Sequence, residues 1–287
     1  MGKLIIASDT SIDLSKELIE KYDIKTAPFS VILGEEQYKD GVDITPDDIY
    51  AYHDRTGTLG KTAAINVAEA EEFFRSLKEN DDDEIIFFTI SKTVSGTNQY
   101  ACVAASEVGG VYVIDTKNLS TGGGLSAIKA CEMRNEGKTA EEIVDFINNK
   151  MVDYVNASFV IDSLEYLHKG GRCSTLAALG ANLLKLKPCI EVKNGSMAVG
   201  KKYRGKFADV LVEYTQARLE DADNIDLDRV FVTHAGVDME IVNAVAEQVK
   251  KTLPFKEVLI TRAGATVSCH CGRNTLGVLF VQKTPVE

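Results

Sequence analysis

The sequence has no long hydrophobic run and no excess of positive charge. None of its apolar stretches approaches the roughly 20 residues that a membrane-spanning helix needs, which excludes stable membrane insertion. Its 287 residues include 32 Lys and Arg against 43 Asp and Glu, a net charge of −11. Because nucleic acids and anionic membranes repel such a chain, the charge argues against either as a general partner.

Signals for export and for disulfide formation are also lacking. The first apolar stretch, residues 3–7, is too short for the hydrophobic part of a signal peptide, and Asp9 follows at once. The six cysteines are scattered along the chain. We therefore expect reduced thiols in a cytoplasmic protein.

Common catalytic motifs are missing as well. The sequence has no Gly-x-x-x-x-Gly-Lys-Ser/Thr phosphate loop and no Gly-x-Ser-x-Gly elbow. The alternative function is that of a phosphotransferase or hydrolase acting on a small anionic substrate. Such an enzyme would place Ser91, Ser95, Asp9 and Asp115 around a phosphate. No general base is clearly tied to a serine, so we expect a binding protein rather than an enzyme.

What is present is a central stretch over residues 84–100. An apolar run at residues 85–90 predicts a buried parallel strand, and an Ala-rich segment from Asn98 predicts a helix. Between them, Ser95, Gly96 and Thr97 lie where open α/β sheets bind ligands. Free backbone N–H groups, the helix dipole and the hydroxyls favour an anion there. A helix N-cap with spare hydroxyls explains the same pattern equally well.

Strands and helices alternate through the first half of the chain, which predicts a mostly parallel sheet with flanking helices. Pro28 within an expected strand at residues 24–33 marks an edge or bulged element. After Asn156 the pattern changes, and Asn194-Gly195 predicts a β-hairpin. We expect two α/β domains, with residues 1–157 carrying the anion-binding loops and residues 158–287 forming a mixed sheet with helices.

Several local features leave two explanations open. Gly122-Gly123-Gly124 precedes an expected helix, where close packing is the commoner cause and a phosphate cradle the rarer one. Residues 56–62 are expected to form a loop, and Ser174 is expected to cap a helix that ends near Leu184.

Residues 168–206 contain nine Lys and Arg and one acid, Glu191. Such a run is usually a solvated face, with an anionic partner as the minority explanation.

These stretches together resemble the DegV family of bacterial fatty-acid-binding proteins over nearly the whole chain. The resemblance depends on their order and spacing, above all on Leu-Glu-Tyr-Leu-x-Lys-Gly-Gly-Arg at residues 164–172 together with Ser-Gly-Thr at residues 95–97. Other matching parts are Ser8 to Leu14, Lys61-Thr62, Val113 to Thr116, Lys187-Pro188, Tyr203-Arg204-Gly205 and His270-Cys271-Gly272.

The resemblance implies a long-chain fatty acid, such as palmitate, in a buried tunnel between two domains. It implies that hydroxyls of Thr62 and Ser95 hold the carboxylate, with Gly96, Thr97 and His270 nearby. Some family members present the acid to a separate fatty acid kinase, which would place Lys169 and Arg172 near the head group and the kinase. No catalysis by the binding protein and no cofactor is implied; the expected role is lipid transport or fatty acid metabolism.

This sequence departs from the family pattern at two places. The family often has Thr-Ser-Gln-Pro where this chain has Thr62-Ala63-Ala64-Ile65, which removes a potential carboxylate donor. It often has His-x-Gly-Pro-Gly where this chain continues from His270 with Cys271-Gly272-Arg273-Asn274. Arg273 either pairs with a ligand carboxylate or faces solvent.

Two further expectations concern the remaining histidines, cysteines and apolar residues. If Cys269-His270-Cys271 is extended, both sulfurs point away from the imidazole, and no second Cys/His pair is spaced for zinc, so no metal site is expected. His53 and His234 are expected to be structural. Plausible tail-lining residues, among others that form ordinary core, are Phe29, Leu125, Ile128, Ile161, Leu164, Leu167 and Leu179.

Overall fold

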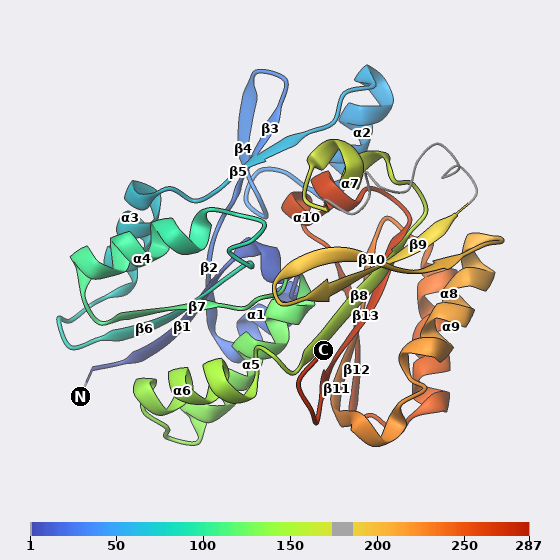
Figure 1. Cartoon of the computed structure of the whole chain (residues 1–287). Helices are drawn as coiled ribbons and strands as arrows, with labels where there is room; N and C mark the ends of the chain where they lie inside the picture. Colours follow the sequence, from blue (N-terminus) through green and yellow to red (C-terminus); the bar gives the residue numbers. More distant parts are fainter. Residues whose placement is uncertain (1, 174–185, 287) are drawn as a thin grey trace.

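The computed structural model describes residues 2–173 and 186–286, which form two main α/β layers side by side (Figure 1). A four-stranded sheet belongs to the first half of the sequence and a six-stranded sheet mainly to the second. The predicted α/β class, with one parallel and one mixed sheet, is confirmed.

The four-stranded sheet is entirely parallel, in the order β2-β1-β6-β7. Residues 85–88 of β6 are fully buried, as expected for a strand with helices on both faces. Helices α3 and α4 pack on one face, and α1, α5 and α6 on the other. The elements of this layer are β1 (Leu4–Asp9), α1 (Lys16–Tyr22), β2 (Ile24–Ala27), α3 (Val67–Leu77), β6 (Glu84–Thr89), α4 (Thr97–Val108), β7 (Val111–Asp115), α5 (Thr121–Asn135) and α6 (Ala140–Lys150).

The six-stranded sheet is mixed, in the order β10-β9-β8-β13-β11-β12. Among the described strand pairs of this sheet, β11–β12 is parallel and the others are antiparallel. Asn194 (φ 49°) and Gly195 (φ 80°) form the predicted hairpin turn between β9 and β10. Helices α8 and α9 cover the outer face. The elements are β8 (Val155–Ile161), β9 (Lys187–Lys193), β10 (Ser196–Tyr203), α8 (Phe207–Arg218), β11 (Ile225–Ala235), α9 (Met239–Thr252), β12 (Glu257–Arg262) and β13 (Thr275–Gln282).

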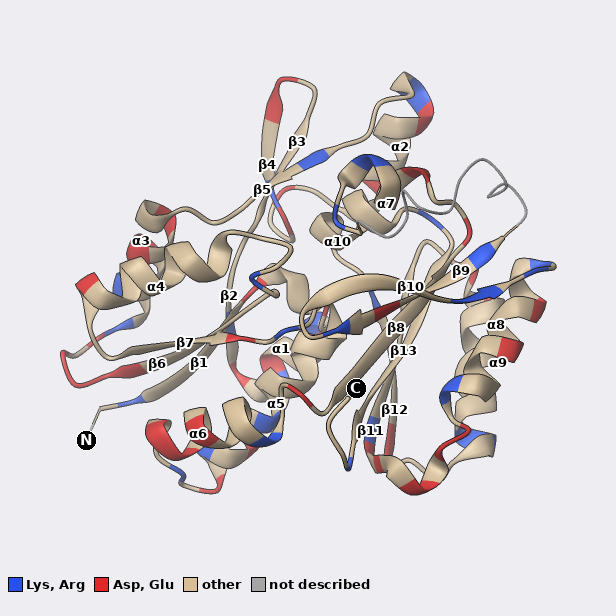
Figure 2. Cartoon of the chain, viewed as in Figure 1, with Lys and Arg blue, Asp and Glu red and all other residues tan. Residues whose placement is uncertain are grey.

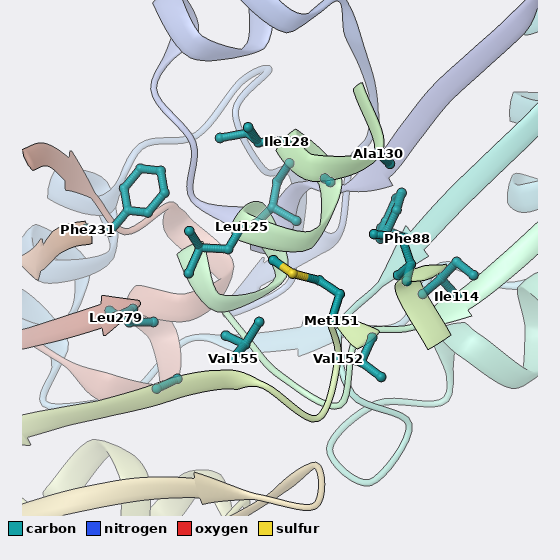
Figure 3. Close-up of a cluster of buried hydrophobic side chains, with 14 of the residues drawn as sticks. Phe88, Ile114, Leu125, Ile128, Ala130, Met151, Val152, Val155, Phe231 and Leu279 are labelled. Carbon is teal, nitrogen blue, oxygen red and sulfur yellow. The ribbon is translucent and has the colours of Figure 1, made fainter. Parts of the chain in front are cut away.

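Helix α5 joins the two layers because it packs against strands of both sheets. Figure 3 shows Leu125 and Ile128 of this helix in one cluster with Phe88 of the parallel sheet and Phe231 of the mixed sheet. The glycine triplet lies inside α5 rather than before it. A Cβ on Gly122 would stand 2.2 Å from Asn118 Oδ1. This contact, with the loop that precedes α5, supports the close-packing explanation at Gly122.

A small antiparallel sheet, in the order β4-β3-β5, corrects two predictions. The expected strand at residues 24–33 is interrupted at Pro28, which fixes its own φ and has no N–H to donate. Its first part joins the parallel sheet as β2 and its second part becomes β3. The expected loop at residues 56–62 ends in a strand. The elements are β3 (Ser30–Leu33), β4 (Glu36–Lys39), α2 (Pro46–Thr56) and β5 (Lys61–Ala63).

Two short helices, α7 (Glu165–Gly170) and α10 (Ala265–Cys271), lie beside this small sheet and complete the described fold. The segment Cys269-His270-Cys271 is therefore helical, not extended. The helix predicted to begin at Ser174 lies outside the described residues. Within residues 2–173 and 186–286, every helix is too short or too polar to cross a bilayer.

Candidate functional site

A cavity of about 190 Å³, called here the main cavity, lies where the loop after β6, strand β5 and helix α10 meet. Its wall is mostly apolar, and the polar groups Thr62, Ser95 and His270 belong to it. The other wall residues are Phe29, Ala64, Ile90, Val94, Gly96, Leu119, Phe159, Leu167, Arg172, Met197, Thr266, Val267 and Cys271. Both halves of the sequence contribute wall residues to this cavity.

The predicted loop after β6 places Ser95 and Gly96 in the wall of the main cavity. The Ser95 hydroxyl lies 3.0 Å from that of Thr97 and accepts a bond from the Thr97 N–H at 3.2 Å. Thr97 is fully buried, and its hydroxyl also accepts from the Ile65 N–H at 3.3 Å. Thr97 therefore supports Ser95 instead of facing the cavity.

Thr62 and His270 come from opposite halves of the sequence and are in contact in the wall of the main cavity. Thr62 Oγ1 on β5 lies 2.7 Å from His270 Nε2 on α10. Burial lowers the pKa of His270 to about 4, and the nearby Arg172 contributes to that decrease. The imidazole is consequently neutral near pH 7 and carries a single ring hydrogen. His270 Nδ1 is buried and has no hydrogen-bond partner in the described chain.

A second cavity of about 40 Å³, the deep cavity, adjoins the main cavity. The two share Leu119, Phe159, Val267 and Cys271 as wall residues. We call these four shared residues the neck. Beyond them, the wall of the deep cavity includes residues of strands β11 and β13.

A third space of about 340 Å³, called here the mouth, adjoins the main cavity. Thr62, Arg172 and His270 border both the main cavity and the mouth, and Lys169 borders the mouth. Arg172 is exposed, and its Nη1 donates to the Gly170 carbonyl at 2.6 Å. Lys169, which lies on α7, and Arg172, which follows this helix, therefore border the same space as Thr62 and His270.

Arg273 lies away from these three spaces. It forms an ion pair with Asp54 at 2.8 Å and its guanidinium covers the Tyr50 ring at 4.8 Å. Several lysines in the described part of the basic run are paired with acids, and Figure 2 shows both blue and red segments on α7. Its ion pairs include Lys169–Glu165, Lys187–Asp162, Lys193–Glu191 and Lys201–Glu213.

Two buried acidic side chains from the first half of the chain, Asp13 and Asp40, bind the N-terminus of α10. Asp13 Oδ1 accepts from the Gly264 N–H at 2.7 Å. Asp40 accepts from the N–H groups of Ala265 at 2.9 Å and Thr266 at 3.1 Å. Burial raises the pKa of Asp13 to about 8, and the nearby Asp40 adds to that rise. Because helix N-termini leave such N–H groups free, these acids fix the helix that carries His270.

The sequence reasoning missed several wall residues, namely Phe159, Met197, Thr266 and Val267. Of the proposed tail-lining residues, Phe29 and Leu167 border the main cavity. Leu125, Ile128 and Ile161 belong to the buried core between the sheets, and Leu164 packs against it. Leu179 lies outside the described residues. Apolar character alone cannot separate cavity wall from core, because both are made of the same residue types.

The groups that a catalytic site would need have structural bonds instead. Asp9, whose pKa burial raises to about 6, accepts bonds from the N–H groups of Ser11 at 3.0 Å and Ile90 at 2.8 Å. Asp115 accepts from the Lys117 N–H at 3.0 Å. The hydroxyl of Ser95 is paired with Thr97, which is no general base. In the described chain, the Ser95 hydroxyl thus bonds to another hydroxyl and not to a basic side chain.

Metal ligation finds no support in the geometry. Cys269 and Cys271 are both buried, and burial raises the pKa of Cys269 to about 12, which disfavours the thiolate that a metal needs. Among residues 2–173 and 186–286 there is no group of three or more His, Cys, Asp or Glu side chains arranged to hold an ion. The ring of His53 packs against that of Tyr166, with the ring centroids 5.1 Å apart and the planes tilted by 55°.

Comparison with known proteins matches residues 3–283 to the family described as "Uncharacterised protein, DegV family". The chain belongs to the DegV family. A DegV domain-containing protein of Clostridium perfringens is 32% identical over 297 residues, covering 99% of this chain and all of the relative. A fatty acid-binding protein of Thermotoga maritima is 30% identical over 282 residues, covering 96% of each chain.

Solved structures of DegV proteins have the same fold. A DegV family protein of Thermus thermophilus, described by its fatty acid binding, has a TM-score of 0.89 at 27% identity and covers 98% of this chain and 99% of its own. A stearic acid-binding protein of Eubacterium ventriosum has a TM-score of 0.85 at 28% identity and covers 99% of each. The family resemblance inferred from the motifs is confirmed over the whole chain.

Proposed function

We propose that this DegV protein binds one long-chain fatty acid, such as palmitate, between two units formed by residues 1–157 and 158–287. The carboxylate lies against Thr62 and Ser95, and the tail runs through the main cavity and its neck. The observation that carries the proposal is that the hydroxyl residues Thr62 and Ser95 line one mostly apolar cavity, which shares wall residues with a second apolar cavity. Fatty acid binding by the relatives from Thermotoga and Thermus supports it.

The tail supplies most of the affinity in this proposal. Burying about 14 methylenes at ~0.8 kcal/mol each gives about 11 kcal/mol before the costs of ordering the ligand. The head group needs only enough donors to avoid a buried carboxylate without partners. An uncharged site of hydroxyls is therefore sufficient for tight binding.

Two supporting groups orient the hydroxyls toward the ligand. When the single ring hydrogen of His270 is on Nε2, it donates to Thr62 and leaves the Thr62 hydrogen for the carboxylate. When Thr97 donates to Ser95, the hydrogen of Ser95 is free in the same way. Thr97 and His270 thus act through Ser95 and Thr62.

Mass spectrometry of lipid extracted from protein purified without added fat tests this function. We expect a co-purifying long-chain acid, or stoichiometric binding of added palmitate or oleate where the purified protein is empty. The absence of any acyl chain together with no binding of either acid would refute the proposal. Steady hydrolysis of acyl or phosphate esters by pure protein would favour the enzymatic alternative.

Ser95→Ala is expected to weaken palmitate binding only about tenfold. The substitution removes one hydrogen bond to a charged group, worth roughly 1.5 kcal/mol, while the tail contacts remain. Titration calorimetry or fluorescence displacement would measure the change. Ser91→Ala is the matched control, because Ser91 bonds to Thr93 and is not among the wall residues. A loss of many orders of magnitude would show that the head group dominates the affinity.

We further propose that Lys169 and Arg172 at the mouth face a fatty acid kinase, to which this protein presents the carboxylate. Arg172→Glu is then expected to reduce kinase-dependent formation of acyl phosphate at least tenfold when the variant and the original protein are both saturated with palmitate. Lys250→Glu on the outer helix α9 serves as the charge-matched control. Unchanged phosphorylation by Arg172→Glu, measured with the kinase of a DegV-containing bacterium, would contradict this role.

A further inference from the structure

Thr266 differs from every other hydroxyl residue in the walls of the main and deep cavities. Each of the others has a hydrogen-bond partner for its hydroxyl within the described chain; these residues are Thr62, Ser95, Ser120, Thr233 and Thr275. The Thr266 hydroxyl is buried and has none. Its side chain is 4% exposed.

An unpaired buried hydroxyl costs free energy, and folded proteins rarely leave one without a partner. In the first turn of a helix, a threonine hydroxyl normally bonds to a nearby backbone group. Thr266 makes no such bond, although its backbone is fixed because its N–H donates to Asp40 Oδ2 at 3.1 Å. A partner in the cavity that Thr266 lines would satisfy the hydroxyl.

The position of Thr266 on α10 indicates what that partner is. Thr266 precedes His270 by four residues, so the two side chains lie one above the other on the same face of the helix. His270 in turn contacts Thr62 at 2.7 Å. Thr266 is thus the third hydroxyl residue of the main-cavity wall, together with Thr62 and Ser95. An anionic head group in this cavity is bordered by all three.

We propose that Thr266 is a further ligand-binding residue, whose hydroxyl donates a hydrogen bond to the carboxylate of the bound fatty acid. This inference rests on the proposed lipid-binding function and adds a third hydroxyl to Thr62 and Ser95. A carboxylate has about four sites for accepting hydrogen bonds, and two hydroxyls leave some of them empty. The third donor comes from a third element of the fold, so the head group holds β5, the loop after β6 and α10 together.

The test compares two variants against two ligands. Thr266→Val removes the hydroxyl and keeps the shape, and Thr266→Ser keeps the hydroxyl. We expect Thr266→Val to bind palmitate about tenfold more weakly. Its affinity for 1-hexadecanol, whose neutral head group has one oxygen, should remain within about twofold. Thr266→Ser should bind palmitate nearly as well as the original protein.

A spectroscopic readout separates ligand contact from a structural role. Hydrogen bonds to a carboxylate favour its charged form, so removing one raises the pKa of the acid. In a titration of [1-13C]palmitate followed by NMR, the pKa of the bound carboxyl is expected to be higher in Thr266→Val than in Thr266→Ser. A hydroxyl that only stabilises the helix would leave that pKa unchanged.

Two results would overturn the inference: palmitate binding by Thr266→Val as tight as in the original protein, or equal losses for palmitate and 1-hexadecanol. Should Thr266→Val fail to fold, Thr266→Ala gives the same comparison with a smaller side chain. If the original protein binds neither palmitate nor oleate, the proposed function itself fails. If it binds them and only the Thr266 variants show no effect, the function stands and this inference alone is wrong.

Discussion

Val267→Phe is expected to lower palmitate affinity about a hundredfold. Val267 borders both the main and the deep cavity, so a larger side chain there closes the neck between them. A tail that loses burial of about four methylenes loses roughly 3 kcal/mol, which is slightly more than a hundredfold in affinity. Equilibrium binding of palmitate to the purified variant measures the effect.

Chain length supplies the control for this prediction. Decanoate has a shorter tail, so its affinity should fall much less than that of palmitate in Val267→Phe. Val267→Ala leaves the neck open and should change palmitate binding only a few-fold. Equal losses for decanoate and palmitate in Val267→Phe, with normal thermal stability, would show that the tail does not pass Val267.

Asp40→Ala is expected to cost about 2–5 kcal/mol in the free energy of unfolding. The substitution leaves the buried N–H groups of Ala265 and Thr266 without their acceptor, and each such group costs about 1–3 kcal/mol. Since α10 carries wall residues of the main cavity, palmitate affinity should fall as well. Urea denaturation and palmitate titration of the same preparation measure both effects.

Asp238→Ala is the matched control for the carboxylate cap. Asp238 is exposed, caps helix α9 by accepting from the Glu240 N–H at 2.8 Å, and is not a wall residue of the main or deep cavity. Loss of such a surface cap typically costs about 1 kcal/mol. Asp40→Asn, which retains one acceptor oxygen, should be intermediate. If Asp40→Ala were no more destabilising than Asp238→Ala, the two acids would not be what holds α10 in place.

The hydroxyl loop was predictable from sequence because its signals are local. An apolar run, a break with Ser95 and Gly96, and an Ala-rich helix give strand, loop and helix without reference to the rest of the chain. Thr62 and His270 were inferred from family motifs, and their contact at 2.7 Å joins residues 208 positions apart. The hydrophobic pattern of each segment describes only local structure, so it could not have predicted that Thr62 and His270 are in contact.

The form of α10 could not be predicted for a physical reason. The segment around Cys269 and His270 has β-branched and cysteine residues, and its N-cap, Gly264, makes no side-chain cap of its own. The caps come from Asp13 and Asp40, which are distant in the sequence. A helix stabilised by remote carboxylates looks like an extended segment when only its own residues are considered.

The break at Pro28 shows a similar limit. Proline within an apolar run correctly indicated an irregular strand, but the run could not say that its two parts join different sheets. That division creates the small sheet, and β5 of this sheet carries Thr62. The position of Thr62, the second hydroxyl proposed to bind the carboxylate, therefore depends on how the chain divides between two sheets. No local sequence pattern specifies that division.

A crystal structure of the protein with palmitate tests the central claim most directly. The account predicts electron density for one acyl chain, with its carboxylate within hydrogen-bond distance of the Thr62 and Ser95 hydroxyls and its tail passing Val267 toward the deep cavity. A carboxylate bound elsewhere, a chain running out through the mouth, or an empty cavity in crystals grown with saturating palmitate would contradict it.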